Sequence, residues 1–282
     1  MQAESFISIK PSSKKLRQYI AYYYFHSATD PLLKKHFLYY PNHKNAVTVY
    51  KNSKIIYQPG YSASVPCTHT PISILYSGIQ SQYRIAEIQA PFDKIGIVFQ
   101  SLGINHFIKG NLNDVFPRTD DKSFGHFGES FKEACLVAYN EPLLDKRVNI
   151  LDDFFQVNYQ AFREENLVKC INYIEGASHK PTVQQLSEQF HTHRRTLLRL
   201  FKTHIGCSVK TYIDIVQFRK AVNNYLDPIK DTKKLTELAH QYHFYDQSEF
   251  IRHLNKLTGS NPRHFFNSLT TLGSENTFWT IK

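Results

Sequence analysis

Residues 182–202 read TVQQLSEQFHTHRRTLLRLFK, and the pattern of this stretch decides the fold of the C-terminal part of the chain. Thr182 followed by Gln185 predicts a capping box, which satisfies backbone N–H groups at the start of a helix. A short polar turn at His191-Thr192 then separates two runs with apolar residues at helical spacing. The stretch predicts two short helices joined by a tight turn, whose buried faces carry Leu186, Phe190, Leu197, Leu200 and Phe201.

A second stretch repeats this arrangement. Residues 235–254 read LTELAHQYHFYDQSEFIRHL, with one extra residue in the turn and with Asp246 and Glu249 placed to cap the second helix. A helix-turn-helix unit requires such a pair, because the first helix braces the second while the second enters the major groove of DNA. A helical bundle with accidental symmetry is the alternative. The corresponding apolar residues are Leu186 and Leu238, Phe190 and Tyr242, Leu197 and Phe250, and Phe201 and Leu254.

The segment between the two units is an amphipathic stretch from Val209 to Leu226, which Asp227-Pro228 ends. As a helix of 18 residues it spans about 27 Å. Successive major grooves on one face of DNA are ~34 Å apart. We therefore expect one chain to reach two adjacent grooves.

This region resembles the AraC/XylS family of bacterial transcription regulators over about 100 residues. The resemblance implies a DNA-binding domain with two helix-turn-helix units, preceded by a cupin-like sensory domain. The residues that carry it are Thr182 to Ser187, Thr196 to Lys202, Gly206, Tyr212-Ile213, Leu238-Ala239, Phe244 to Phe250, Arg252, and Gly259 to Phe265.

Some positions depart from the family pattern. His243 stands where the family favours Gly, and Phe266 and Gln217 stand where it often has Arg. Leu254-Asn255 replaces the usual Phe-Lys. Because lost Lys and Arg side chains remove phosphate contacts, we expect the first unit to carry more of the affinity for DNA.

The predicted DNA contacts are the positions of each second helix that lie off its apolar stripe. In the first unit, four basic residues within nine positions and no acid among them favour DNA contact over an ordinary solvated face. Arginine can bond a guanine bidentately, glutamine suits adenine, and Leu198 could meet a thymine methyl. The predicted contact residues are Arg194, Arg195, Leu198, Arg199 and Lys202 in the first unit and Gln247, Ser248, Ile251 and Arg252 in the second.

The N-terminal region predicts a different architecture. Between Phe37 and Phe99, short segments rich in Tyr, Ile and Val alternate with turn signals, which indicates a β-barrel or sandwich. The run Tyr22-Tyr23-Tyr24-Phe25 either lines a ligand cavity or packs in the core, and core packing is favoured. The predicted strands are Ala46 to Tyr50, Lys54 to Tyr57, Ile72 to Tyr76, Tyr83 to Ile88 and Lys94 to Phe99.

Helices follow these strands, one over residues 124–139 and one over residues 142–162. In the second, apolar residues at spacings of four and three form a heptad seam. Two interpretations stay open, a dimerisation helix or an amphipathic helix packed on its own barrel. The seam consists of Leu144, Val148, Leu151, Phe155, Asn158 and Phe162.

Composition bounds the function. A net charge of +10 and a pI near 9.3 favour a polyanionic partner. Cys67, Cys135, Cys170 and Cys207 form no C-x-x-C pair and no secretory signal begins the chain, so free thiols in a reducing cytoplasm are expected. No apolar run approaches the ~18 residues of a membrane span.

The sequence shows only weak motifs for metal binding or catalysis. The pairs His191/His193 and His240/His243 lack further ligands for a four-coordinate metal site, and the barrel's His36, His43 and His69 do not form a cupin metal motif. No nucleophile and base stand together, and Cys67 lacks the flanking motif of a repair methyltransferase. We therefore expect no metal, no cofactor and no enzymatic activity.

Together these patterns predict an α+β protein, with a cupin-like β-barrel and flanking helices followed by an all-α double helix-turn-helix domain. The expected divisions are residues 1–140 (sensory domain), 141–164 (linker and candidate dimerisation helix), 165–270 (DNA-binding domain) and 271–282 (tail). The expected function is transcription regulation in response to a small-molecule effector, with effector and ligand-binding residues unknown. The alternative is a constitutive regulator whose N-terminal domain only dimerises or binds a partner protein. Expected partners are double-stranded promoter DNA, a second copy of the chain and RNA polymerase.

Overall fold

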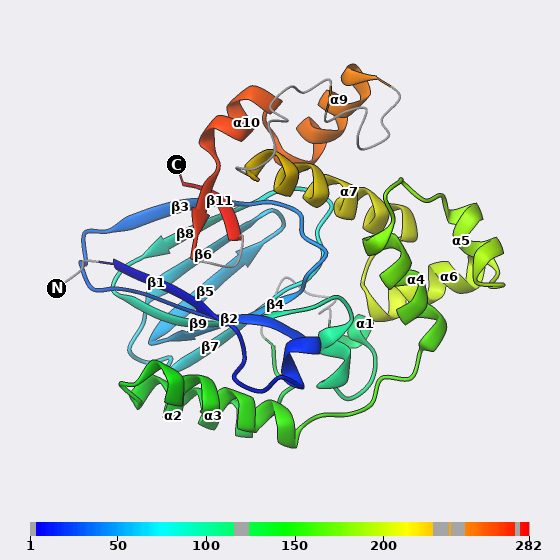
Figure 1. Cartoon of the computed structure of the whole chain (residues 1–282). Helices are drawn as coiled ribbons and strands as arrows, with labels where there is room; N and C mark the ends of the chain where they lie inside the picture. Colours follow the sequence, from blue (N-terminus) through cyan, green and yellow to red (C-terminus); the bar gives the residue numbers. More distant parts are fainter. Residues whose placement is uncertain (1–3, 116–123, 228–236, 238–245, 274–276, 282) are drawn as a thin grey trace.

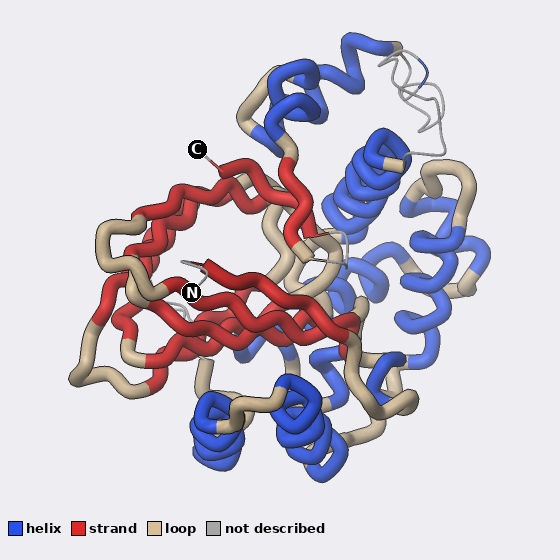
Figure 2. The backbone as a smooth tube through the Cα atoms, turned by 60° about the vertical axis from the view of Figure 1, so that its left-hand side comes forward, coloured by secondary structure: helices blue, strands red, loops and turns tan. Residues whose placement is uncertain are grey.

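Two β-sheets face each other in the N-terminal region, and the C-terminal helices stand beside them (Figures 1 and 2). The computed structural model describes residues 4–115, 124–227, 237, 246–273 and 277–281. The first sheet has the order β1-β2-β9-β4-β7 and the second the order β10-β11-β3-β8-β6-β5. All pairs are antiparallel except β6 with β8. The N-terminal strands are β1 (Glu4–Ile9), β2 (Ile20–Ala28), β3 (Lys34–Tyr39), β4 (Ala46–Lys51), β5 (Ser53–Gln58), β6 (Tyr61–Pro66), β7 (Ile72–Ser77), β8 (Arg84–Gln89) and β9 (Phe92–Phe99).

The α+β fold class is confirmed, but the two sheets do not close into a barrel, because strand pairing stays within each sheet. The five strands predicted between residues 46 and 99 are present as β4, β5, β7, β8 and β9. Strands β1, β2, β3 and β6 were not predicted. In β2 nearly every residue is buried, so the strand lacks the polar–apolar alternation that marks a half-exposed strand.

The predicted heptad seam lies inside one molecule. Helices α2 (Glu129–Asn140) and α3 (Leu144–Val157) pack on the outer face of the first sheet (Figure 1). Val148, Leu151 and Phe155 are completely buried there, in a core shared with Tyr23 and Phe99. A dimer through this seam is therefore wrong, and packing on the chain's own sheet is correct. The heptad spacing arose because a helix lying on a sheet needs a similar apolar stripe.

The predicted helices of the first unit are present. Thr182 and Gln185 form the capping box, since the Thr182 side chain accepts from the Gln185 backbone and the Gln185 side chain from the Thr182 backbone. The first helix of the second unit, with Leu235, Leu238, Ala239 and Tyr242, lies outside the described residues. The described helices of this region are α4 (Glu165–Gly176), α5 (Val183–Gln189), α6 (Arg194–His204), α7 (Val209–Leu226), α9 (Gln247–Thr258) and α10 (Pro262–Ser268).

Two separate cores hold these helices. Helices α4 to α7 form one core together with Ile79 and Leu102 of the N-terminal region, and Leu186, Leu197 and Phe201 are fully buried in it. The core around α9 and α10 is shared with the second sheet, because Leu38 and Tyr40 pack with Phe250, Leu254 and Phe265. The second unit is therefore anchored on the N-terminal region.

Residues 271–282, predicted as a tail, contain a strand of the second sheet. β10 (Thr270–Leu272) pairs with β11 (Thr277–Ile281), and β11 pairs with β3 through Thr280 opposite Leu38 and Ile281 opposite Phe37. The chain thus returns from the helical domain to the N-terminal sheet (Figure 1). No helix among the described residues is long and apolar enough to cross a membrane.

Candidate nucleic-acid interface

Helix α6 presents a basic face to solvent. Leu197, Leu200 and Phe201 anchor its opposite side in the core. All five contact residues predicted for this helix are exposed, and no acidic residue lies between Arg194 and His204. Leu198 is 39% exposed, so an apolar side chain stands among the cations. The exposed set is Arg194, Arg195, Leu198, Arg199 and Lys202.

Helix α5 and the turn hold α6 in place. His191 in the turn has a φ of 47°, the left-handed conformation that reverses the chain tightly. The Ser187 hydroxyl donates to the Thr192 carbonyl at 2.8 Å, which ties the end of α5 to the turn. On the far side of α6, the rings of Phe201 and Tyr212 meet edge to face at 5.6 Å. The basic face is therefore carried on a braced helix.

Helix α9 occupies the corresponding place in the second unit. The Asp246 carboxylate accepts from the Glu249 backbone N–H at 2.6 Å and so caps the helix, as predicted. Gln247, Ser248 and Arg252 are exposed, whereas Ile251 is only partly so. With one cation among the four predicted positions, this face carries less positive charge than that of α6.

Helix α7, the predicted connection of 18 residues, is also part of the contact with the N-terminal region. Buried Arg219 donates from Nε to the Pro41 carbonyl at 2.5 Å and from Nη2 to the Tyr40 carbonyl at 2.9 Å. Burial lowers the pKa of Arg219 to about 9, so it stays charged at neutral pH. The position of this helix is thus tied to the loop that follows β3.

A cavity of about 540 Å³ lies between the two sheets and reaches α7. Tyr22 and Tyr24 of β2 line it, whereas Tyr23 and Phe25 on the opposite face of the same strand belong to the core under α2 and α3. Alternate residues of the aromatic run therefore line a cavity and pack in the core, as the alternation of side chains along a strand requires. Arg219 and Asn223 of α7 complete the wall.

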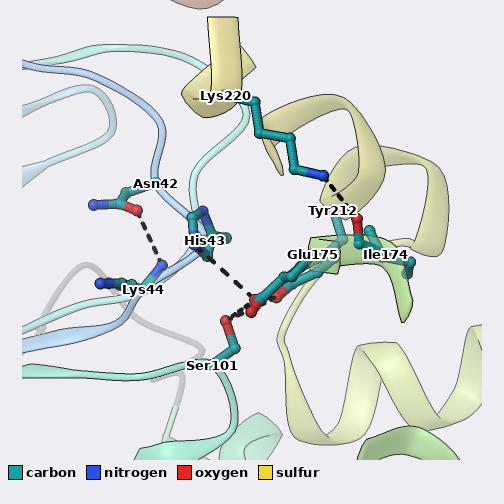
Figure 3. A network of polar contacts seen from close by, with 8 residues as sticks. All are labelled: Asn42, His43, Lys44, Ser101, Ile174, Glu175, Tyr212 and Lys220. Atoms are coloured by element: carbon teal, nitrogen blue, oxygen red, sulfur yellow. Dashed lines mark hydrogen bonds and ion pairs between the residues drawn. The ribbon is translucent and has the colours of Figure 1, made fainter. Parts of the chain in front are cut away.

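A polar network links the N-terminal region to the helical domain beside this cavity (Figure 3). The Glu175 carboxylate of α4 accepts from the Tyr212 hydroxyl at 2.6 Å and from the Ser101 hydroxyl. His43, which also lines the cavity, places Nε2 4.0 Å from the same carboxylate. Burial, with help from Lys44, Arg219 and Lys220, lowers the pKa of His43 to about 3, so the ring is neutral at pH 7. The contact is therefore polar and not an ion pair.

Sequence patterns did not reveal these interdomain residues. Arg219, His43 and Glu175 lie on segments far apart in the chain, and their roles follow from strand pairing and helix packing. Among the described residues, no group of three or more His, Cys, Asp or Glu side chains is placed to hold a metal ion. The four cysteines are unpaired, as predicted.

Comparison with known proteins identifies the C-terminal domain. Residues 186–268 match the family described as a helix-turn-helix domain. No curated protein matches the sequence.

Solved structures of ToxT from Vibrio cholerae are similar at low identity. One has 11% identity, covers 95% of this chain and 98% of its own, and gives a TM-score of 0.46. A ToxT structure with bound unsaturated fatty acid has 10% identity, covers 86% and 97%, and gives a TM-score of 0.44. The identification of the domain itself rests on the match over residues 186–268 and on the α5–α6 pair inside it. Residues 186–268 are thus identified as a helix-turn-helix domain.

Proposed function

We propose that the chain is a DNA-binding transcription regulator whose helices α6 and α9 enter adjacent major grooves and whose cavity takes a small-molecule effector. The observation that carries this proposal is the exposed basic face of α6, which lies within the region that matches the helix-turn-helix family. Bidentate arginine contacts to guanine are the commonest specific contact of such helices. The nine predicted contact residues named above for α6 and α9 are the proposed interface.

The proposal that the chain binds an effector rests on the position of the cavity beside helix α7. Its wall includes Arg219 and Asn223 of the helix that connects the two units. Tyr40 lines the same cavity, and its backbone carbonyl accepts from Arg219 while its ring meets Phe265 of α10 at 4.8 Å. A ligand that displaces the loop at Tyr40 would therefore act on the connecting helix α7 and on α10, which packs with α9 of the second unit. ToxT has been solved with a fatty acid bound, which is consistent with a ligand-responsive regulator.

The partners follow from this function. Promoter DNA is the primary partner, and RNA polymerase is a further candidate. A homodimer would need a surface other than the α3 seam, which is buried. Such a regulator works at the bacterial chromosome, in the cytoplasm, and catalyses no reaction. The alternative function, constitutive DNA binding with a purely dimerising or partner-binding N-terminal domain, predicts that no small molecule stabilises the chain.

The test is the salt dependence of DNA binding by the full chain, because the second core is shared between the domains. A duplex recovered from a randomised library should be bound with an affinity that falls steeply with salt. If the four cations of α6 each displace a counterion, the logarithmic slope is about −3.6, or about 150-fold between 50 and 200 mM.

The control is Lys146→Gln, an exposed cation on α3 far along the chain from α6. This variant should keep the wild-type slope. Absent or salt-insensitive binding by the wild type would contradict the proposed function.

A further inference from the structure

The cavity has an unbalanced charge. Its described lining includes the cations Lys10, Lys44, Arg84 and Arg219 and no Asp or Glu. Arg219 uses its donors on the carbonyls of the loop after β3. A positive wall without acids favours an anionic occupant.

Arg84, at the start of β8, is the least satisfied of these cations. Its side chain lines the cavity and is only 4% exposed. Nη2 donates to the Ser77 hydroxyl at 3.2 Å, but Nε and Nη1 are buried without a hydrogen-bond partner. No carboxylate among the described residues forms an ion pair with it. Because a buried guanidinium loses its hydration, its three N–H donors on Nε and Nη1 carry a desolvation penalty, which a bound hydrogen-bond acceptor would offset.

Two aromatic rings lie close to the guanidinium of Arg84. It lies 5.5 Å from the ring centre of Tyr57 and 5.9 Å from that of Tyr39. Tyr24, Tyr39 and Tyr50 also line the cavity. Burial raises the pKa of Tyr50 to about 12 and those of Tyr24 and Tyr39 well above their usual value, so these hydroxyls stay protonated. Flat faces with protonated hydroxyls suit a planar ring that carries polar substituents.

We propose that the cavity binds an aromatic carboxylate, held by Arg84 through its anionic group and by the surrounding tyrosines through its ring. The planar donors of arginine match the two oxygens of a carboxylate. Aliphatic side chains are few on the described lining (Ala46, Leu75, Ala86 and Val98), which disfavours a long alkyl chain. This inference rests on the proposed function, because it gives the chemical class of the effector.

The experiment compares three probes on the full chain by thermal unfolding and calorimetric titration. 4-Hydroxycinnamate carries the ring and the anion, 4-hydroxycinnamamide carries the ring alone, and decanoate carries the anion on an alkyl chain. Saturable stabilisation by 4-hydroxycinnamate, with weaker binding of the other two, is expected. Equal binding of the amide, tighter binding of decanoate, or no binding of 4-hydroxycinnamate overturns the proposal.

Variants test the role of Arg84 itself. Arg84→Met should weaken 4-hydroxycinnamate binding by about 10- to 150-fold, the value of a hydrogen bond to a charged group, and leave amide binding unchanged. The Tm of this variant without ligand should not fall, because most of the N–H donors that it loses form no hydrogen bond in the unliganded protein. A lower Tm with unchanged affinity would assign Arg84 a structural role and overturn the proposal. Arg84→Lys keeps the positive charge but lacks the planar donors, so it should bind 4-hydroxycinnamate with intermediate affinity. This variant replaces Arg84→Met in the test if the methionine variant does not fold.

Arg163→Gln, at an exposed arginine outside the cavity, is the matched control and should bind like the wild type. DNA binding is measured in parallel without probe. A chain that binds DNA but no aromatic carboxylate contradicts this inference alone, whereas a chain that binds no DNA contradicts the proposed function.

Discussion

At the residue scale, Arg199 and Lys202 are proposed to divide the work of α6. Arg199 lies one turn beyond Arg195 on the exposed face, opposite the anchors Leu197 and Phe201. Arg199→Ala should cost ~1 to 3 kcal/mol on the preferred site and relax the preference at one base position. Lys202→Ala should weaken all sequences alike and reduce the salt slope by about one.

Competition of both variants against a randomised site library measures this difference. The Lys202 variant is the matched control, because it removes one cation from the same helix. An Arg199 variant that loses general affinity but keeps its base preference would show that another residue reads the groove.

At the element scale, α3 is a structural helix of the N-terminal domain. Its residue Leu151 is completely buried in an apolar core, so Leu151→Asp places a carboxylate among hydrophobic side chains. The free energy of unfolding should fall by several kcal/mol, since burying an unpaired charge is among the most costly changes in a protein. Urea unfolding followed by circular dichroism gives this value.

Val157→Asp, at an 84% exposed position on the same helix, is the control and should change stability little. If Leu151→Asp instead left the monomer as stable as the wild type and only changed its oligomeric state, the position of α3 would be wrong.

Elements differ in how well local sequence predicts them. The capping box at Thr182 and the Asp246 cap are local hydrogen-bond patterns, and both form as predicted. Strand β2 was not predicted because its burial on both faces removes the alternation of polar and apolar residues. Strand β11 was not predicted because it is a strand only through its pairing with β3, which is distant in the sequence. The α3 seam shows that spacing identifies an apolar stripe but does not say which surface covers it.

At the scale of the whole molecule, the domain order and the DNA-binding domain were predictable, and the cavity was not. Residues such as Arg84, Tyr40 and Arg219 come together only after strands and helices distant in the chain have packed. The alternating faces of Tyr22-Tyr23-Tyr24-Phe25 were the one local signal of this cavity.

The stability of the whole molecule should depend on the neutral state of enclosed histidines. Burial lowers the pKa of His43 to about 3 and also lowers those of His106, His204 and His253. Since an unfolded histidine takes up a proton near pH 6.5, the unfolded state binds more protons than the folded state below that pH. The free energy of unfolding should therefore fall as the pH drops from 7 to 4.

For His43 alone this loss approaches about 1.4 kcal/mol per pH unit below 6.5. Urea unfolding of the wild type and of His43→Asn at pH 7, 6 and 5 isolates the contribution, because carboxylates contribute equally to both. Parallel pH profiles for the two proteins would show that His43 titrates normally in the folded chain.

The pairing of β11 with β3 has a consequence for synthesis on the ribosome. β3 emerges early, but the strand that covers its edge emerges about 240 residues later. At ordinary translation rates this leaves the edge open for about 10 to 50 s, while the helix-turn-helix domain is still being made. Open strand edges recruit other strands, and charged side chains, especially lysine, discourage this. β3 begins with Lys34 and Lys35, so the nascent sheet carries its own protection against aggregation until the chain returns to it.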